Sequence, residues 1–215
     1  KSTVTFLDKL PDGHMGFPGN LTVETTYKVA QSTIDIVIEA STDKTTLCNF
    51  TNHSYFNLDG TKNIANHQLM VECDKVLPVD ENGIPISGPI FAKDLDLDFK
   101  TGRTLNNNGK PIEVDHNFCI SNTRQNLRRN AFVTAKNISL ELFSTEPGLQ
   151  VYTGKGLNSG NEKIWGKYPY REFAGIALEP QIWPDAPNQI DFPNPILQPG
   201  DKYKHHTRLK FSRTK

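Results

Sequence analysis

The sequence has 215 residues, of which 36% are hydrophobic and 22% are charged, as in globular proteins rather than disordered chains. Its 24 lysines and arginines balance its 24 aspartates and glutamates. The zero net charge argues against a nucleic-acid or anionic-membrane partner that is recognised through a global electric field. No apolar run reaches the roughly 18 residues that a membrane-spanning helix needs.

Alternating apolar and polar residues predict β-strands along most of the chain. The runs 21–29 and 34–38 alternate clearly, and the short link between them predicts a hairpin. No sustained helical period is found, and 14 prolines and 15 glycines separate the runs, as turns do. Further strands are predicted at residues 1–6, 46–50, 68–73, 117–120, 138–143, 149–153, 174–178 and 203–211. Short strands with such turns are typical of an all-β sandwich or barrel.

No internal repeat or low-complexity linker divides the chain, so residues 1–215 are predicted to form a single β domain. Two stretches, 84–105 and 154–171, are predicted to be long loops, which on a β-scaffold are often functional. The chain begins within a strand pattern and without methionine, so we expect a further part of the protein upstream of Lys1.

The three cysteines, Cys48, Cys73 and Cys119, are widely spaced and odd in number. This pattern fits neither a zinc site nor a disulfide framework. We interpret them as buried, reduced thiols of a cytoplasmic protein. The histidines lack the spacing of common metal sites, and no Gly-rich phosphate loop follows a strand pattern, so we expect no metal and no cofactor.

His53 lies in a polar and aromatic run, residues 51–58, that ends in a turn. If the strand predicted from Thr46 continues, His53 shares a face with Leu47, Asn49, Thr51 and Tyr55, a mixture that suits the wall of a cleft. An ordinary histidine pKa near 6.5 suits proton donation at neutral pH. The alternative is a hydrogen-bonded structural histidine.

Glu179 ends an apolar strand pattern. By parity it points with Gly175 and Ala177, whose small size leaves room for a ligand, and Pro180 is predicted to end the strand there. Partial burial would raise the pKa of Glu179 toward that of a useful base. The alternative is a strand-end carboxylate that is paired with a cation or faces water.

Asp115 lies between a predicted loop and a strand and could cap a turn or accept hydrogen bonds from a ligand. Its neighbour His116 must face the opposite way in a strand, so we expect only one of the two to reach a ligand.

Six motifs, in order, resemble those of the aldose 1-epimerases, also called galactose mutarotases, and they cover essentially the whole chain. The motifs are residues 16–21 (GFPGNL), 51–58 (TNHSYFNL), 115–118 (DHNF), 146–154 (EPGLQVYTG), 178–181 (LEPQ), and 192–193 (FP) with 197–200 (LQPG).

The resemblance implies a galactose-mutarotase-like β-sandwich, often called a supersandwich. It also implies an isomerase that interconverts the α and β anomers of aldohexoses such as galactose and glucose. By the motif positions, His53 would be the general acid, Glu179 the general base and Asp115 a ligand of sugar hydroxyls. Acid–base chemistry needs such a donor and acceptor together. A cofactor is not implied.

Two departures accompany the resemblance. The family usually has asparagine after residues 152–154, where this chain has Lys155. Family members also carry an upstream arginine and a further histidine in the sugar site, and His14 does not lie in that context. We therefore expect the chain to be the C-terminal portion of an aldose 1-epimerase domain, with a sandwich that is incomplete at the N-terminus and that could associate with the missing segment.

Two other functions fit a sandwich of this kind: a non-catalytic carbohydrate-binding module, and a structural sandwich with a vestigial pocket. A glycosidase is less well supported because no second carboxylate with its own motif flanks a scissile bond.

Overall fold

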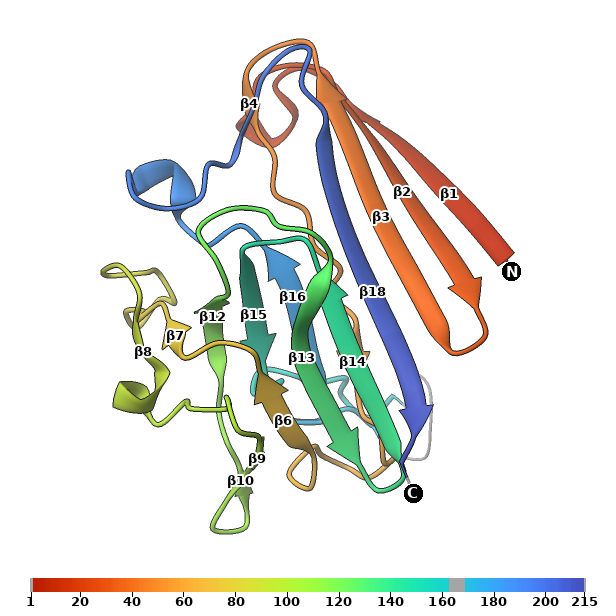
Figure 1. Ribbon diagram of the computed structural model, residues 1–215, viewed down its shortest axis with the longest axis vertical. Helices are drawn as coiled ribbons and strands as arrows, with labels where there is room; N and C mark the ends of the chain where they lie inside the picture. Colours follow the sequence, from red (N-terminus) through yellow and green to blue (C-terminus); the bar gives the residue numbers. More distant parts are fainter. Residues whose placement is uncertain (1, 163–168, 215) are drawn as a thin grey trace.

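The computed structural model describes residues 2–162 and 169–214, and their regular secondary structure is almost entirely β-strand (Figure 1). The all-β expectation is confirmed. The larger sheet contains, in spatial order, β1 (Ser2–Leu10), β2 (Leu21–Ala30), β3 (Thr33–Thr42), β18 (Tyr203–Arg213), β14 (Ile138–Ser144), β13 (Arg128–Ala135), β6 (Gln68–Val71) and β9 (Arg103–Thr104). The smaller sheet contains β5 (Tyr55–Phe56), β16 (Ile176–Gln181), β15 (Gly148–Tyr152), β12 (Asp115–Cys119), β7 (Lys75–Val76) and β8 (Ile90–Phe91).

Short elements connect these strands. They are the strand pairs β10 (Asn106–Asn107) with β11 (Lys110–Pro111) and β4 (Thr46–Leu47) with β17 (Ile196–Leu197), and the 3₁₀ turns η1 (His14–Gly16), η2 (Ala92–Leu95) and η3 (Ala186–Asn188). Within the described part of the chain, no helix is long and apolar enough to cross a membrane.

The hydrophobic core lies between the two sheets. Figure 1 shows β12 and β15 of the smaller sheet to the left of β13 and β14 of the larger one. The inward side chains of both sheets join one buried cluster, to which Val133 and Leu140 contribute from one side and Phe118 and Leu149 from the other. The smaller sheet therefore buries one face and leaves its other face for a site.

The predicted hairpin is confirmed, because β2 and β3 pair in an antiparallel ladder across the two-residue turn at 31–32. The stretch 84–105 is only partly a loop, since it contains β8, η2 and β9. Residues 154–162 and 169–171 form no strand, as predicted, and residues 163–168 of that predicted loop lie outside the described residues.

The strand predicted at 46–50 is wrong beyond Leu47. Residues 48–54 pair with no strand, and backbone groups among them bond to a loop and to side chains instead. The Cys48 amide donates to the Pro195 carbonyl at 2.8 Å, and the Phe50 amide donates to the Tyr203 hydroxyl at 3.1 Å. Alternation in the sequence cannot show whether a partner strand is present.

Strand β13 was not predicted. Its first residues are two arginines and an asparagine, and its register with β14 shifts between Arg129 and Ala131. Such a bulge breaks the alternation on which the prediction depends, and it leaves Asn130 fully buried.

Candidate active site

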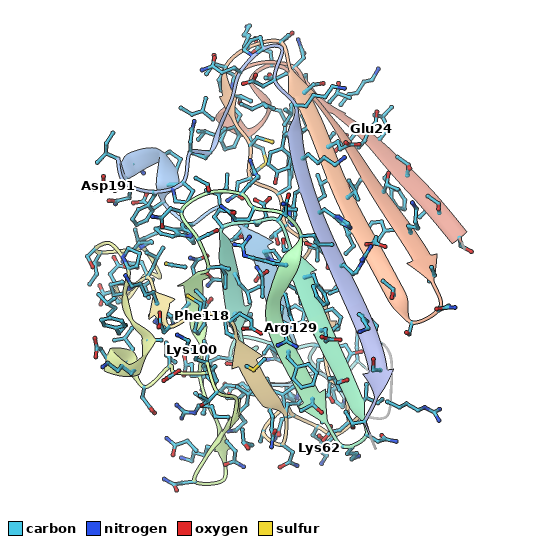
Figure 2. The ribbon with its side chains drawn as sticks, viewed as in Figure 1. Glu24, Lys62, Lys100, Phe118, Arg129 and Asp191 are labelled. Atoms are coloured by element: carbon cyan, nitrogen blue, oxygen red, sulfur yellow. The ribbon has the colours of Figure 1, made fainter. Side chains whose placement is uncertain are left out.

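The outward face of the smaller sheet is polar because β15 alternates strictly. Leu149 and Val151 point into the core, so Gln150 and Tyr152 point outward. Phe118, labelled in Figure 2, pairs with Leu149 and belongs to the same buried cluster. Everything directly opposite Gln150 or Tyr152 on the neighbouring strands therefore faces outward too.

The register of the ladder decides which side chains meet on that face. Gln150 lies opposite Glu179 of β16, and Tyr152 lies opposite Asp115 of β12. Residues directly opposite in an antiparallel pair have side chains on the same face, about 5 Å apart at Cβ. Two carboxylates, an amide and a phenol thus come together from three adjacent strands.

His53 joins this group from outside the sheet. On the edge of β16, Tyr55 lies opposite Ala177. Continuing this register by two residues along each strand places His53 opposite Glu179. Its Nε2 lies 3.5 Å from Oε1 of Glu179, and the two side chains are 50% and 10% exposed. The histidine is open to solvent while the carboxylate lies beneath it.

The parity predicted for Glu179 is confirmed, but its predicted place at a strand end is wrong. Strand β16 continues through Pro180, opposite Leu149, to Gln181. Proline is tolerated there because β5 pairs only with Ile176 and Ala177, so no strand on that edge needs its missing N–H. Glu179 thus lies within β16, where it pairs with Gln150 of β15 on one side and has no strand partner on the other.

The room expected beside Gly175 is filled by an aromatic residue. A Cβ atom at Gly175 would lie 3.1 Å from the Tyr55 Cβ and 3.4 Å from the Phe56 carbonyl oxygen. Glycine here allows β5 to approach β16 closely. The small residue therefore serves the placement of Tyr55 rather than leaving open space.

Burial raises the pKa of Glu179 above its ordinary value of 4.5. The nearby His53 lowers this pKa and the Asp115 carboxylate raises it, and the net direction is upward. A carboxylate with a raised pKa is a stronger base once ionised. The site therefore places a strengthened base against an accessible imidazole.

Asp115 is exposed at the start of β12 and accepts a hydrogen bond from the Gln150 Nε2 at 2.7 Å. His116, opposite Val151, lies on the core side, where burial lowers its pKa. The prediction that the two neighbours face opposite ways is confirmed, and Asp115 is the one on the polar face.

Gln150 was overlooked in the sequence although it stands in the motif at residues 146–154. Its Nε2 donates to Asp115, and its buried Oε1 has no hydrogen-bond partner among the described residues. A buried acceptor without a partner is uncommon and suits a group that meets a ligand. Only the strand register, which the sequence does not display, places this amide between Asp115 and Glu179.

Two tyrosines form an aromatic wall beside His53. The ring centroids of His53 and Tyr55 are 5.0 Å apart, and Tyr152 lies 6.4 Å from His53 and 6.2 Å from Tyr55. The Tyr152 hydroxyl is held by the Gly156 amide at 2.6 Å. Burial, together with Tyr152, Glu179 and Asp115, raises the pKa of Tyr55, so it remains a neutral phenol at physiological pH.

Lys155, where the resemblance departs from the family pattern, forms an ion pair with Glu172 at 3.3 Å, and its ammonium lies over the Phe173 ring. Its charge is therefore engaged within its own loop. In the described ranges 2–162 and 169–214, no three His, Cys, Asp or Glu side chains gather in a way that could hold a metal ion.

Comparison with known proteins places this arrangement in a family. The family model described as aldose 1-epimerase matches residues 1–210. Human galactose mutarotase is 38% identical over 214 residues, which cover 94% of this chain and 60% of the human protein. The aldose 1-epimerase of Escherichia coli K12 is 34% identical over 221 residues, which cover 97% of this chain and 63% of that protein.

Solved structures of aldose epimerases resemble this chain in fold. An aldose epimerase homologue from C. elegans has a TM-score of 0.89 at 27% identity, with 99% of this chain and 66% of that one covered. A galactose 1-epimerase from Lactobacillus acidophilus NCFM has a TM-score of 0.81 at 27% identity, with 99% and 63% covered. The galactose-mutarotase-like fold is thereby confirmed, and the chain spans 60–63% of the length of these curated relatives. The chain belongs to the aldose 1-epimerase family.

Proposed function

We propose that the protein interconverts the α and β anomers of aldohexoses such as galactose and glucose, with His53 and Glu179 as the acid–base pair. The observation that carries the proposal is the 3.5 Å separation of the His53 Nε2 and the Glu179 Oε1. In a cyclic aldose, the C1 hydroxyl oxygen and the ring oxygen are bonded to the same carbon. A base for the first and an acid for the second must therefore lie close together.

The reaction needs one proton removed and one supplied. Glu179 takes the proton of the C1 hydroxyl while protonated His53 gives a proton to the ring oxygen, and the bond between C1 and that oxygen breaks. The C1 aldehyde rotates about the C1–C2 bond. On closure over either face, the imidazole takes back the proton of the attacking hydroxyl and the Glu179 carboxyl returns its proton to the carbonyl oxygen. Positioned acid and base groups each contribute typically 10²–10⁴-fold.

The side chains around the acid–base pair are suited to bind the sugar. Asp115 is suited to accept hydrogen bonds from sugar hydroxyls, and the free Oε1 of Gln150 can accept another. The rings of Tyr55 and Tyr152 offer apolar surface against which the C–H faces of a pyranose can lie. These side chains surround the acid–base pair, so a bound ring would present its anomeric carbon to it.

The test is the mutarotation of freshly dissolved α-D-galactose, followed by polarimetry with this chain and with its Glu179→Gln and His53→Asn variants. We expect this chain to accelerate the approach to equilibrium and each variant to lose most of that acceleration, with unchanged circular dichroism. Saturable galactose binding without acceleration would instead indicate a carbohydrate-binding module. Absence of both would contradict the proposed site.

Two further expectations accompany this proposal. The large hydrophobic cluster that both sheets share supports one β-sandwich domain over residues 1–215. The three cysteines are free and buried, which supports a cytoplasmic, reducing compartment.

A further inference from the structure

The segment that carries His53 is not held by strand pairing. Strand β4 ends at Leu47, β5 begins at Tyr55, and residues 48–54 between them form no strand. Alongside this segment runs β16, where Pro180 has no N–H to offer. Contacts other than strand pairing must therefore hold His53 close to Glu179.

Asn49 supplies a link between this segment and the end of β16. Its Oδ1 accepts a hydrogen bond from the Ile182 amide at 2.9 Å, and its Nδ2 donates to the Ile182 carbonyl at 3.1 Å. Ile182 directly follows β16 and is only 1% exposed. One carboxamide thus makes the donor–acceptor pair that a backbone bridge would make.

The segment is consequently fastened to β16 at two points, with the reacting groups between them. At one point Asn49 holds Ile182, and at the other Tyr55 and Phe56 pair with the beginning of β16. The His53 Nε2 and the Glu179 Oε1 approach within this span.

Apart from the bond of the Cys48 amide to the Pro195 carbonyl, the other long-range hydrogen bonds of the segment within the described structure run to the larger sheet. The Phe50 amide and carbonyl meet the Tyr203 hydroxyl and the His205 Nδ1, and the Asn52 Nδ2 donates to the Tyr27 hydroxyl at 3.2 Å. These bonds hold the segment to the opposite layer, whereas the two fastenings are the hydrogen-bonded links between the described residues 48–56 and β16 with Ile182.

We propose that Asn49 is a positioning residue for the acid–base pair, and that its amide sets the separation of His53 from Glu179 by clamping the segment to Ile182. The inference rests on the proposed function. Asn49 itself lies four residues before His53 and touches neither reacting atom.

The chemistry of the clamp is specific to an amide. Asparagine offers a donor and an acceptor in one plane, whereas aspartate offers acceptors only and would set a carboxylate oxygen against the Ile182 carbonyl. Alanine offers neither group. Because Asn49 is exposed, neither replacement opens a core cavity.

The clamp also has an electrostatic consequence. Glu179 is faced by His53, Asp115, Tyr55 and Tyr152, and of these His53 lowers its pKa. If the segment loosens and His53 moves away, the pKa of Glu179 rises further. The base is then protonated up to a higher pH, and the acid limb of the activity profile moves upward.

The experiment compares Asn49→Ala and Asn49→Asp with the control Thr45→Val. Thr45 directly precedes β4, and its hydroxyl donates to the Gln198 side-chain oxygen at 2.9 Å rather than to β16. Polarimetry gives kcat and KM, and ¹³C NMR of the Glu179 carboxyl, assigned through Glu179→Gln, gives its pKa in each variant.

We expect kcat to fall roughly ten- to a hundredfold in both Asn49 variants, as misplaced reacting groups do, with KM nearly unchanged. The pKa of Glu179 should rise in both, and Thr45→Val should match the parent chain. An unchanged kcat and an unchanged Glu179 pKa would overturn the proposal, whatever the loss in melting temperature.

If the parent chain does not accelerate mutarotation, the proposed function fails. The pKa of Glu179 in the variants still tests whether Asn49 positions His53. A Glu179 pKa that rises in the two Asn49 variants and not in Thr45→Val would support it, and equal values in all four proteins would exclude it.

Discussion

His53 lies opposite Glu179 as though β5 continued along β16, yet no backbone hydrogen bond joins the two segments at that point within the described structure. The histidine therefore keeps the register of a strand without being part of one. This allows its imidazole to remain half exposed while the carboxylate beneath it is buried. A general acid that meets substrate and a base with a raised pKa both depend on this difference in burial.

We predict that Glu179→Gln does not destabilise the fold at neutral pH. Because the pKa of Glu179 is raised in the folded state, its ionisation costs stability there. The carboxyl is neutral in both states well below pH 4.5, and the cost appears as the pH rises through the folded-state pKa. Urea unfolding at acid and neutral pH should show the variant gaining stability relative to the parent as pH rises. A variant that loses relative stability at neutral pH would contradict the burial argument.

We also predict that the acid limb of the activity profile lies above pH 4.5. In the proposed reaction Glu179 must be ionised to take the C1 hydroxyl proton, and burial raises its pKa above that ordinary value. The profile of kcat/KM against pH for the parent chain checks this, since it reports the free enzyme. An acid limb at or below pH 4.5 would show that another group limits the reaction.

Substitutions at Asp115 and Gln150 should move that limb in opposite directions. Asp115→Asn removes a negative charge that raises the pKa of Glu179, so the limb should shift to lower pH while KM for galactose increases. Gln150→Glu adds a negative charge directly opposite Glu179, so the limb should shift to higher pH. Shifts in the same direction would refute the electrostatic description of the site.

Gly175→Ala should destabilise the fold and lower activity together. The added methyl would lie 3.1 Å from the Tyr55 Cβ, so β5 must move away from β16 and take the His53 register with it. Overpacking of this kind costs about 1–3 kcal/mol. Thermal unfolding and polarimetry measure the two effects. Gly88→Ala is the matched control, since a Cβ there meets nothing within 4 Å, and equal behaviour of the two variants would contradict the packing argument.

Sequence patterns could predict the features that depend on one strand or on two strands joined by a short turn. The hairpin of β2 and β3 follows from alternation and a short link, and the outward direction of Glu179 follows from parity with Ala177. The opposite facing of Asp115 and His116 follows in the same way.

Features that depend on the pairing of strands that no short turn joins could not be predicted. Gln150 reaches Asp115 and faces Glu179 only because of the registers of β15 with β12 and β16. Pro180 was expected to end its strand, because the sequence does not show that the edge of β16 is unpaired there. Asn49 and Ile182 are joined by a side chain, which leaves no periodic signal at all.

The most direct test of the acid–base pair is a double-variant cycle on the rate of galactose mutarotation. His53 and Glu179 are proposed to act in the same step, so His53→Asn combined with Glu179→Gln should lose hardly more activity than the more damaging single variant. Losses that multiply in the double variant would show that the two residues act independently, and the central claim that they form one catalytic pair would then be wrong.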